Sequence, residues 1–337
     1  MVMRSWSSWP LRWKFLAGFV LIVLVSVVGT VEVAERLLES TLQKRIVEEF
    51  QGIARTQRAA LEQNLWHELE SLSIGAEEET LVFEAIDHSA RYADPTLRAY
   101  MIQQEELLWK TQPTSGLRRR VLQGPAAEKL RALRGRLSGH LHLLLTDAHG
   151  VLIAATEPTR AYRFDQEPWW QAAWNQGRGA PYISTLLFDE DLQTSVVYLA
   201  VPVYRRDTHQ AVGVLRSAYG AFQIFGILSQ FRTGQTGRAL LIDRDGTVLM
   251  DPMGLLHRDQ RVTDLAPILG GGARPEGDLL TSEWLIAYSR VGMGIGYRLP
   301  SLEERGWILA VLQREDEAMA PVAHLGRQAL LWTLALG

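Results

Sequence analysis

The sequence has no cysteine among its 337 residues. This absence excludes a disulfide framework, a cysteine nucleophile and a thiolate zinc site. A strong charge bias is missing too, because 35 lysines and arginines are balanced by 38 aspartates and glutamates, for a formal net charge of -3. Nucleic-acid binding requires a basic patch, whereas the arginines here are scattered along the chain. No nucleic-acid partner is therefore expected.

Motifs for catalysis and for tightly bound groups are missing as well. There is no Walker loop, HExxH sequence or nucleophile elbow. His140 and His142 are spaced to share one face of a strand, as in some metal sites, but no third ligand accompanies them. We expect no enzyme activity, cofactor or metal, and any catalytic output domain would lie beyond Gly337.

One long stretch near the N-terminus lacks charge altogether. Residues 15–31 read FLAGFVLIVLVSVVGTV, and an extension to Ala34 gives a helix long enough to cross a hydrocarbon core of ~30 Å. Basic residues precede this stretch and acidic residues follow it. The positive-inside rule therefore predicts a transmembrane helix at 15–34, with the tail 1–14 in the cytoplasm and the rest of the chain outside.

A cleaved signal peptide is the alternative interpretation of this stretch. Its apolar region would usually span about 7–15 residues and end at a small-x-small cleavage site. The run here is longer, no convincing site follows it, and a helical pattern continues beyond it. The retained anchor is therefore favoured.

The region between the anchor and His140, residues 35–139, has a helical pattern. Apolar residues recur every three or four positions from Leu38 to Leu72, which predicts one apolar stripe on a long stalk helix. Further helices are expected at about 95–110 and 125–137, with a loop around Gly116 between them. The stripe could face a second copy of the stalk or the chain's own domain.

Beyond this helical region the pattern changes to short apolar runs separated by turn residues, as in antiparallel strands. An apolar strand, an Asp-x-x-Gly turn and another apolar strand occur at 145–153 and again at 241–249. Gly150 and Gly246 would supply the positive φ of a tight hairpin. Two copies of one module are therefore predicted.

These observations divide the chain into a series of segments. The first module is expected at 140–236 and the second at 237–322. Residues 323–337 end in an apolar run that is too short to span a bilayer. They predict the start of a second transmembrane helix, with a C-terminal helix packed on the domain as the alternative.

With these features in place, the chain resembles the double Cache sensor family of bacterial transmembrane receptors, which includes chemoreceptors, sensor histidine kinases and diguanylate cyclases. The resemblance rests on the order and spacing of the two Asp-x-x-Gly hairpins and of the stretches 168–173, 199–203, 213–215 and 306–307. It implies an α+β fold, in which a transmembrane helix and a long stalk helix precede two PAS-like modules, each with a central antiparallel sheet. The first module would be membrane-distal and the second membrane-proximal.

The resemblance also implies a ligand site in the membrane-distal module. In the amino-acid-binding branch this site has a Tyr, an Arg-x-Trp followed by an aromatic residue, and an Asp on a later strand. Here Tyr162, Trp169 and Trp170 occupy the aromatic positions, but Glu167 replaces the arginine and the aspartate position falls near Ala218. A glutamate would repel a carboxylate and, beside aromatic rings, would suit a cationic amine. Alternatively, Glu167 points to solvent and both tryptophans belong partly to the core.

Further candidates lie on strands that should line the same cavity: Tyr182, Ser184, Tyr198 and Arg216. The neighbouring acidic loop of Asp189, Glu190 and Asp191 would either cap a cation or form a solvated turn.

The function implied is the ligand-sensing input region of a receptor in the bacterial inner membrane, with its sensor domain extracytoplasmic. It would bind a small molecule in the distal module, relay binding through its transmembrane helices, and form a homodimer through the stalk helix. The alternative is a membrane-tethered binding or scaffolding protein without its own cytoplasmic output.

Overall fold

The computed structural model describes residues 11–254, 274–292 and 300–322. Most of the expected cytoplasmic tail and the expected second span lie outside the described residues. The predicted α+β class with antiparallel sheets is confirmed.

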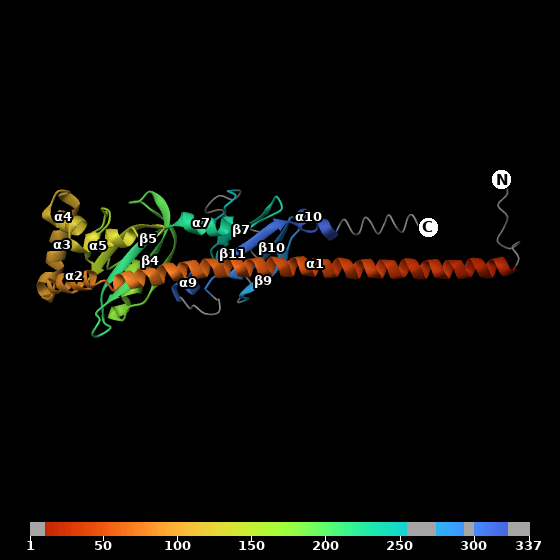
Figure 1. The fold of residues 1–337 in the computed structure, drawn as a ribbon, viewed down its shortest axis with the longest axis horizontal. Coiled ribbons are helices and arrows are strands. Elements are labelled where there is room, and N and C mark those ends of the chain that lie inside the picture. Colours follow the sequence, from red (N-terminus) through yellow and green to blue (C-terminus); the bar gives the residue numbers. More distant parts are fainter. Residues whose placement is uncertain (1–10, 255–273, 293–299, 323–337) are drawn as a thin grey trace.

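A single long helix organises the molecule. α1 (Leu11–Ala76) has 66 residues, which at a rise of ~1.5 Å per residue corresponds to a length of about 100 Å. It runs along both sheets, and its N-terminal part projects beyond them (Figure 1). The predicted apolar stripe packs on the chain's own sheets, since Phe50, Leu61, Leu65 and Leu72 are buried there. In the part of the chain that the structure describes, none of the helices combines the length and apolar character that a membrane crossing requires.

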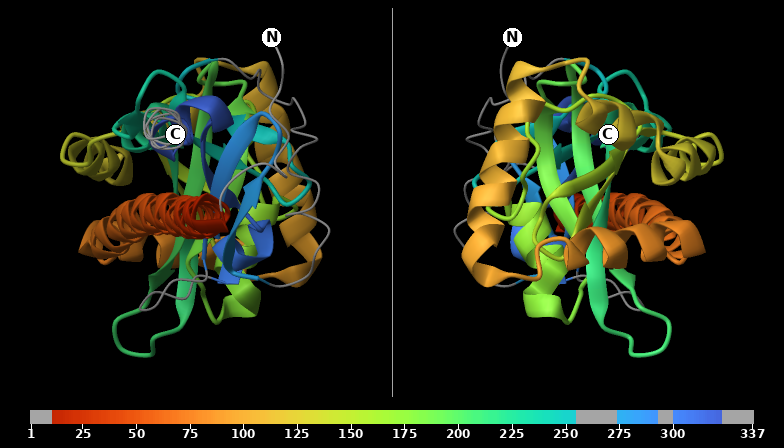
Figure 2. Two further views of the ribbon diagram at one scale, coloured as in Figure 1. Left: turned by 90° about the vertical axis from the view of Figure 1, so that its right-hand side faces the viewer. Right: turned by 90° about the vertical axis from the view of Figure 1, so that its left-hand side faces the viewer.

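Four shorter helices form a cap at the end of the molecule away from the start of α1 (Figures 1 and 2). They are α2 (Glu79–Ala90), α3 (Pro95–Thr111), α4 (Gly116–Gln123) and α5 (Pro125–Arg134). The loop predicted around Gly116 is present at residues 112–115, but Gly116 itself begins a helix. Ser115 caps it by accepting a hydrogen bond from the backbone N–H of Arg118 at 3.3 Å, and Leu117 and Val121 bury its apolar face.

The first sheet is antiparallel, with strand order β2-β1-β5-β4-β3. Its strands are β1 (His140–Asp147), β2 (Leu152–Ala155), β3 (Tyr182–Asp189), β4 (Thr194–Tyr204) and β5 (Ala211–Gly220). One face packs on α1, α2 and α5, and the other is covered by α6 (Pro168–Trp174) together with residues of α3 and α4. Burial on both faces explains why these strands are near-continuous apolar runs.

The second sheet repeats this topology. Its strands are β6 (Arg232–Thr233), β7 (Gly237–Ile242), β8 (Val248–Met250), β9 (Glu276–Leu280), β10 (Trp284–Arg290) and β11 (Ile308–Arg314). Their order is β6-β7-β11-β10-β9, and β8 also pairs with β7. Matching β7–β11 with β1–β5 in chain order therefore gives the same strand neighbours in both sheets. Because β6 pairs with β7, this sheet begins ahead of the expected boundary at Gly237.

The two Asp-x-x-Gly turns have the same geometry. In the first, Oδ1 of Asp147 accepts the backbone N–H groups of His149 and Val151 at 2.8 and 2.9 Å. In the second, Oδ1 of Asp243 accepts those of Asp245 and Thr247, both at 2.9 Å. Both turn glycines have positive φ, +74° in the first turn and +80° in the second. The internal repeat read from the sequence therefore extends to individual hydrogen bonds.

Short helices accompany the two sheets, and the first of them leads from β5 to β6. They are α7 (Ala221–Ser229), α9 (Pro300–Arg305) and α10 (Glu315–Ala318), and a 3-10 turn (Asn175–Gly177) follows α6. α9 lies against β3, the edge strand of the first sheet, where Oγ of Ser301 accepts the backbone N–H of Ile183 at 3.1 Å. This contact covers part of an edge that would otherwise expose unpaired backbone groups.

Replacing Gly150 by alanine should lower the free energy of unfolding by about 2 kcal/mol or more. A Cβ there would lie 2.5 Å from the backbone nitrogen of Asp165 and would be held at positive φ. The matched control is Gly52→Ala in α1, where no atom lies within 4 Å of the added carbon. That variant should be more stable than the parent by up to ~1 kcal/mol. Chemical denaturation measures both, and a destabilised Gly52→Ala beside an unaffected Gly150→Ala would contradict this account.

Candidate functional site

Several of the predicted site residues converge on the α6 side of the first sheet. Strand register pairs Ala200 with Arg216, and pairs both Tyr198 and His142 with Ala218. Residues two positions apart on a strand share a face, so Arg216, Tyr198 and His142 project to the same side. That side is the one α6 covers, because the guanidinium of Arg216 lies against the ring of Trp169.

α6 supplies the outer wall of this site. It begins at Pro168, whose fixed φ suits the first helical position, and ends at Trp174, after which Asn175 adopts the left-handed conformation. Nε1 of Trp170 donates a hydrogen bond to Oγ1 of Thr146 on β1 at 3.0 Å, which fixes the helix on the sheet. Trp169 and Trp170 are both buried. They therefore belong to the core and at the same time border the site.

Arg216 brings a positive charge into the interior. The residue is only 5% exposed, and its guanidinium carbon lies 4.1 Å from the ring centre of Tyr198 and 5.2 Å from that of Trp169. Its Nε has no hydrogen-bond partner, and none of the ion pairs within the described residues includes it. Burial lowers the pKa of Arg216, against the opposing effect of Tyr198 and of more distant carboxylates.

His142 lies beside this arginine with unused ring nitrogens. It is 1% exposed, and neither Nδ1 nor Nε2 has a hydrogen-bond partner among the described residues. The backbone of Glu157 acts to raise the pKa of His142, although neither ring nitrogen reaches it in hydrogen-bond geometry. Burial and then the charge of Arg216 lower the pKa of His142 to about 3. The imidazole is therefore neutral near pH 7, with one N–H to donate.

Asp189 is the nearest buried carboxylate, and the chain itself occupies it. Its Oδ2 accepts the hydroxyl of Tyr198 at 2.8 Å, and its Oδ1 accepts the backbone N–H groups of Asp191 and Leu192 at 2.9 and 3.0 Å. Burial raises the pKa of Tyr198 to about 12, with Arg216 opposing the rise and Asp189 adding to it. The hydroxyl therefore stays protonated and holds Asp189.

The rest of the acidic loop faces outward. Glu190 and Asp191 both form ion pairs with Arg160, at exposed positions. The loop is therefore solvated at Glu190 and Asp191, whereas Asp189 is buried.

Tyr162 belongs to a buried polar network. Its hydroxyl donates to Oε2 of Glu105 at 3.0 Å, Tyr92 donates to the same carboxylate, and Arg91 pairs with it at 2.8 Å. The Tyr162 ring stacks on Trp109, with ring centres 5.6 Å apart. The sequence did not indicate Glu105, because it lies in a helix without a motif, 57 residues away from its partner.

Tyr182 and Ser184, on β3, have hydroxyls that the chain also uses. The hydroxyl of Tyr182 accepts a hydrogen bond from the guanidinium of Arg305, which lies over its ring. Oγ of Ser184 donates to the carbonyl of Thr185 at 2.7 Å and accepts the backbone N–H of Tyr198 at 2.8 Å. Ser184 therefore has no free donor for the site, whereas the Tyr182 hydroxyl accepts from Arg305 and keeps its own O–H as a donor.

Glu167 does not enter the interior. It is exposed, immediately before α6, and its side chain makes no capping hydrogen bond. Of the two interpretations of this residue, the structure has the one in which it points to solvent. The interior charge at the site is that of Arg216, whose sign is opposite to the one an amine ligand requires.

The two histidines of β1 do not share a face, contrary to the prediction. A register shift between them interrupts the pairing with β5, as at a β-bulge. Nδ1 of His140 lies 2.6 Å from Oγ of Ser217, and its Nε2 lies 3.0 Å from Oε2 of Glu68 on α1. His142 faces Arg216 on the other side of the sheet.

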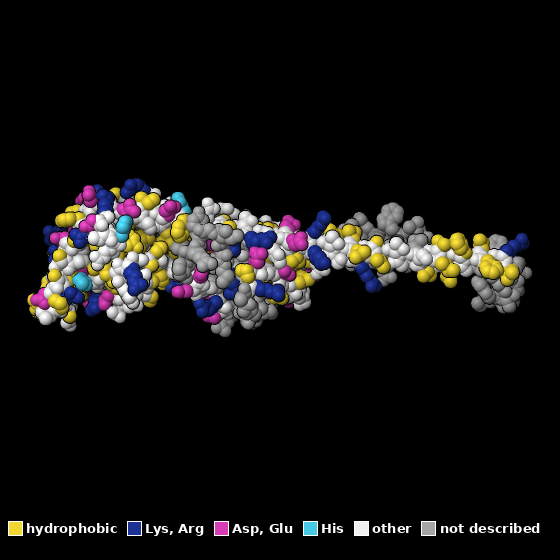
Figure 3. All heavy atoms as spheres, turned by 90° about the horizontal axis from the view of Figure 1, so that it is seen from below, with side chains coloured by type: hydrophobic (Ala, Val, Ile, Leu, Met, Phe, Trp, Pro, Cys, Tyr) yellow, Lys and Arg dark blue, Asp and Glu magenta, His cyan; other side chains and the backbone are white. Residues whose placement is uncertain are grey.

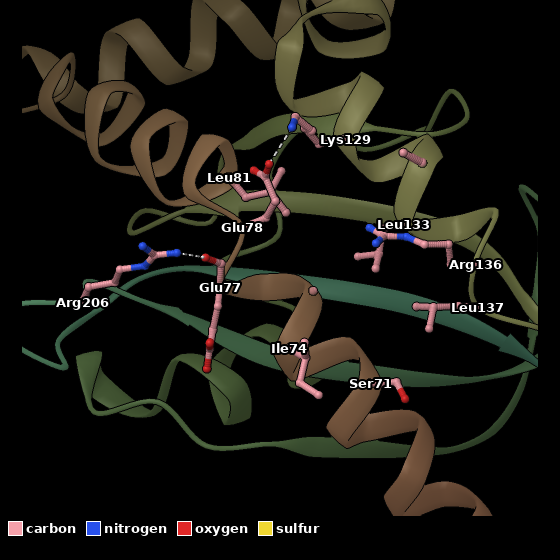
Figure 4. Close-up of a pocket in the computed structure, with 12 residues that line it drawn as sticks. Ser71, Ile74, Glu77, Glu78, Leu81, Lys129, Leu133, Arg136, Leu137 and Arg206 are labelled. Carbon is pink, nitrogen blue, oxygen red and sulfur yellow. Dashed lines mark hydrogen bonds and ion pairs between the residues drawn. The ribbon is translucent and has the colours of Figure 1, made fainter.

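A separate hollow of ≈ 800 Å³ lies between the end of α1, the start of α2, and α5 (Figure 4). Leu81 and Leu133 on its wall belong to the core that packs on α1. Lys129 forms an ion pair with Glu78 at 2.7 Å across one side of it. The first sheet separates this hollow from Arg216, so the two are different sites.

A family comparison agrees with this architecture. The double Cache family model, described as a Cache domain, matches residues 38–322. The chain belongs to the Cache domain family.

Solved structures of Cache proteins share the fold. The sensory domain of the Campylobacter jejuni chemoreceptor Tlp3 has a TM-score of 0.54 and 12% identity, over 83% of this chain and 98% of that one. The ligand-binding domain of the Pseudomonas fluorescens chemoreceptor CtaA, in complex with L-isoleucine, has a TM-score of 0.51 and 14% identity, over 84% and 98%. Among curated protein sequences, none matches the chain. At these identities the likeness shows the Cache fold alone.

Replacing Glu105 by glutamine should lower the free energy of unfolding of the Cache domain. It should also make that free energy depend less on pH in the acidic range. Burial raises the pKa of Glu105, but the hydrogen bond from Tyr92 and the charge of Arg91 outweigh it, so the pKa lies below its ordinary value. Such a carboxylate stabilises the fold above its unfolded-state pKa, and the contribution is lost as the pH falls through the folded-state value. Near pH 7 we expect a loss of about 1–2 kcal/mol.

Thermal unfolding from neutral to acidic pH measures this effect. The parent should lose more stability on acidification than Glu105→Gln does. The control is Glu106→Gln on the same helix, whose carboxylate pairs with Lys110 one turn away at a more exposed position. Identical pH profiles for the parent and Glu105→Gln would count against the network.

Proposed function

We propose that this chain is the ligand-sensing input region of a bacterial transmembrane receptor. The observation that carries the proposal is the continuity of α1, a single helix that packs on both sheets and runs on past them. A ligand that shifts the first sheet against α1 would therefore displace the far end of the same helix. The ligand needs only to bind the two arrangements with different affinity.

An anchoring role for residues 15–34 is supported by the side chains of this part of α1. Large apolar groups gather along its projecting end (Figure 3). Those with exposed side chains are Phe15, Leu16, Phe19, Leu21, Ile22, Val23, Val25 and Val33. An apolar surface of this extent is unusual against water. We infer that it lies in the inner membrane, with the tail 1–14 cytoplasmic and the sheets extracytoplasmic.

The two sheets would then act as a membrane-distal module at 140–236 and a membrane-proximal module at 237–322. The ligand would lie on the α6 side of the distal sheet, where Arg216 and the α6 tryptophans meet. The solved neighbours in complex with L-isoleucine and L-valine are chemoreceptor ligand-binding domains. These complexes support a small-molecule ligand for this chain.

A homodimer through the stalk is supported by the same helix. Leu37 and Leu38 are exposed on α1, between the proposed anchor and the first buried positions. A second copy of α1 would cover them and leave the sheet-facing stripe undisturbed.

The topology can be tested with single cysteines, because the chain has none of its own. Thr208→Cys lies in the exposed turn between β4 and β5. It should react with a membrane-impermeant maleimide in intact cells made permeable at the outer membrane only. Ser5→Cys in the tail should react only after the inner membrane is disrupted. If Thr208→Cys stayed unlabelled in these cells until the inner membrane was disrupted, the extracytoplasmic placement would be refuted.

The dimer can be tested by a cysteine scan of positions 36–48 in native membranes. Oxidative cross-linking should peak every three or four positions, because one face of a helix recurs with that period. Glu70→Cys, exposed near the distal end of α1, serves as the comparison position. Uniformly absent cross-links along 36–48 would argue for a monomer.

A further inference from the structure

The polar groups on the α6 side of the first sheet fall into two classes. The hydroxyls of Tyr162, Tyr182 and Tyr198 are engaged by Glu105, Arg305 and Asp189. Arg216 and His142 are different, since the arginine Nε and both imidazole nitrogens are buried without a hydrogen-bond partner. A buried polar atom without a partner is rare in proteins and calls for an explanation.

The second sheet contains a buried arginine whose charge is paired within the chain, although its Nε, like that of Arg216, makes no hydrogen bond. Arg238 lies 96 residues after His142, at the equivalent position of the repeat, and is 3% exposed. Its guanidinium carbon lies 5.0 Å from the ring centre of Trp284, and its Nε is 3.6 Å from Oδ2 of Asp251. Arg216 has the aromatic neighbours of this arrangement but no carboxylate in contact.

We propose that the missing carboxylate at Arg216 belongs to the ligand, and that the ligand is a small organic acid without an amino group. This inference rests on the proposed sensor function. The rings of Tyr198 and Trp169 lie against the guanidinium, whose N–H groups all point outward in its own plane. A planar carboxylate binds such an edge with two parallel hydrogen bonds, one of them to Nε. The N–H of His142 supplies a neutral donor nearby.

The absence of an ammonium group follows from the surrounding carboxylates. Asp189 already accepts the hydroxyl of Tyr198 and two backbone N–H groups. Glu167 is exposed, and Ala218, on the same face as Arg216, is apolar and buried. An amino acid would therefore place its ammonium beside Arg216 without an unused buried carboxylate within the described residues. A simple amine would meet the same repulsion with no compensating contact.

Two matched sets of compounds separate these possibilities. Propanoate, L-alanine and ethylamine share one small skeleton, and 3-phenylpropanoate, L-phenylalanine and 2-phenylethylamine share a larger one. Each is added at about 10 mM to the full-length chain in detergent, and the shift in Tm is measured, because a ligand of the folded state raises it. Titration calorimetry then gives the affinity. At least one of the two acids should bind, roughly 10-fold or more tighter than its amino-acid counterpart.

Arg216→Met and Arg238→Met form a matched pair of variants. Arg216→Met should abolish the response to the acid, while its unliganded Tm stays equal or rises, because an uncompensated buried charge is removed. Arg238→Met should lower the unliganded Tm, since it leaves Asp251 buried without its arginine, and should keep the response to the acid. Arg216→Lys, which retains the charge but loses the planar edge, should weaken binding roughly 10-fold.

Several results would overturn the organic acid. These are no response to either acid, tighter binding of an amino acid or amine than of its matching acid, or an unchanged acid response in Arg216→Met or Arg216→Lys. None of them touches the receptor topology, which the maleimide labelling decides separately. If Thr208→Cys proved cytoplasmic while an organic acid still bound at Arg216, the proposed receptor topology would be wrong. The ligand site would still stand.

Discussion

Burial of the first sheet on both faces is the constraint on which the rest of this structure depends. α1 with α2 and α5 closes one face, and α6 with the helical cap closes the other. A polar atom inside such a layer destabilises the fold unless it finds a hydrogen-bond partner within the chain. The bonds Trp170–Thr146, Tyr162–Glu105 and Tyr198–Asp189 are the outcome. Against this background a buried arginine without a carboxylate stands out as a group that awaits a partner.

Two physical connections lead from the first sheet to the second sheet. One is α1, which packs on both sheets. The other is α9, which docks on β3 through Ser301 and places Arg305 on Tyr182. Tyr182 pairs in register with Ala200, the neighbour of Arg216 across β4 and β5. A displacement of these strands would therefore act on α1 and α9 together, and coupling by two routes resists independent motion of the sheets.

Whether a feature could be predicted from the sequence depends on how far apart along the chain the interacting residues lie. The Asp-x-x-Gly turns were predictable because Gly150 and Gly246 answer a local backbone requirement. The faces of His140 and His142 were not, since one register shift in the pairing with a distant strand reverses them. The Glu105–Tyr162 bond joins residues 57 positions apart, and no motif marks the glutamate. For Arg216, the sequence allowed the strand and the face of the sheet to be inferred. The lack of a counter-ion could not be inferred, because it depends on every surrounding element.

The two modules share one strand topology but differ in how a buried arginine is paired. In the second, Asp251 reaches Arg238 from within the chain, so its interior charge is compensated whether or not anything is bound. In the first, Arg216 has no such contact, and the unliganded state keeps a buried charge that lowers its stability. A ligand that supplies the carboxylate stabilises the arrangement it binds by mass action. On the proposed sensor function, this difference between conditional and permanent charge pairing would make the first sheet the one that responds to a ligand.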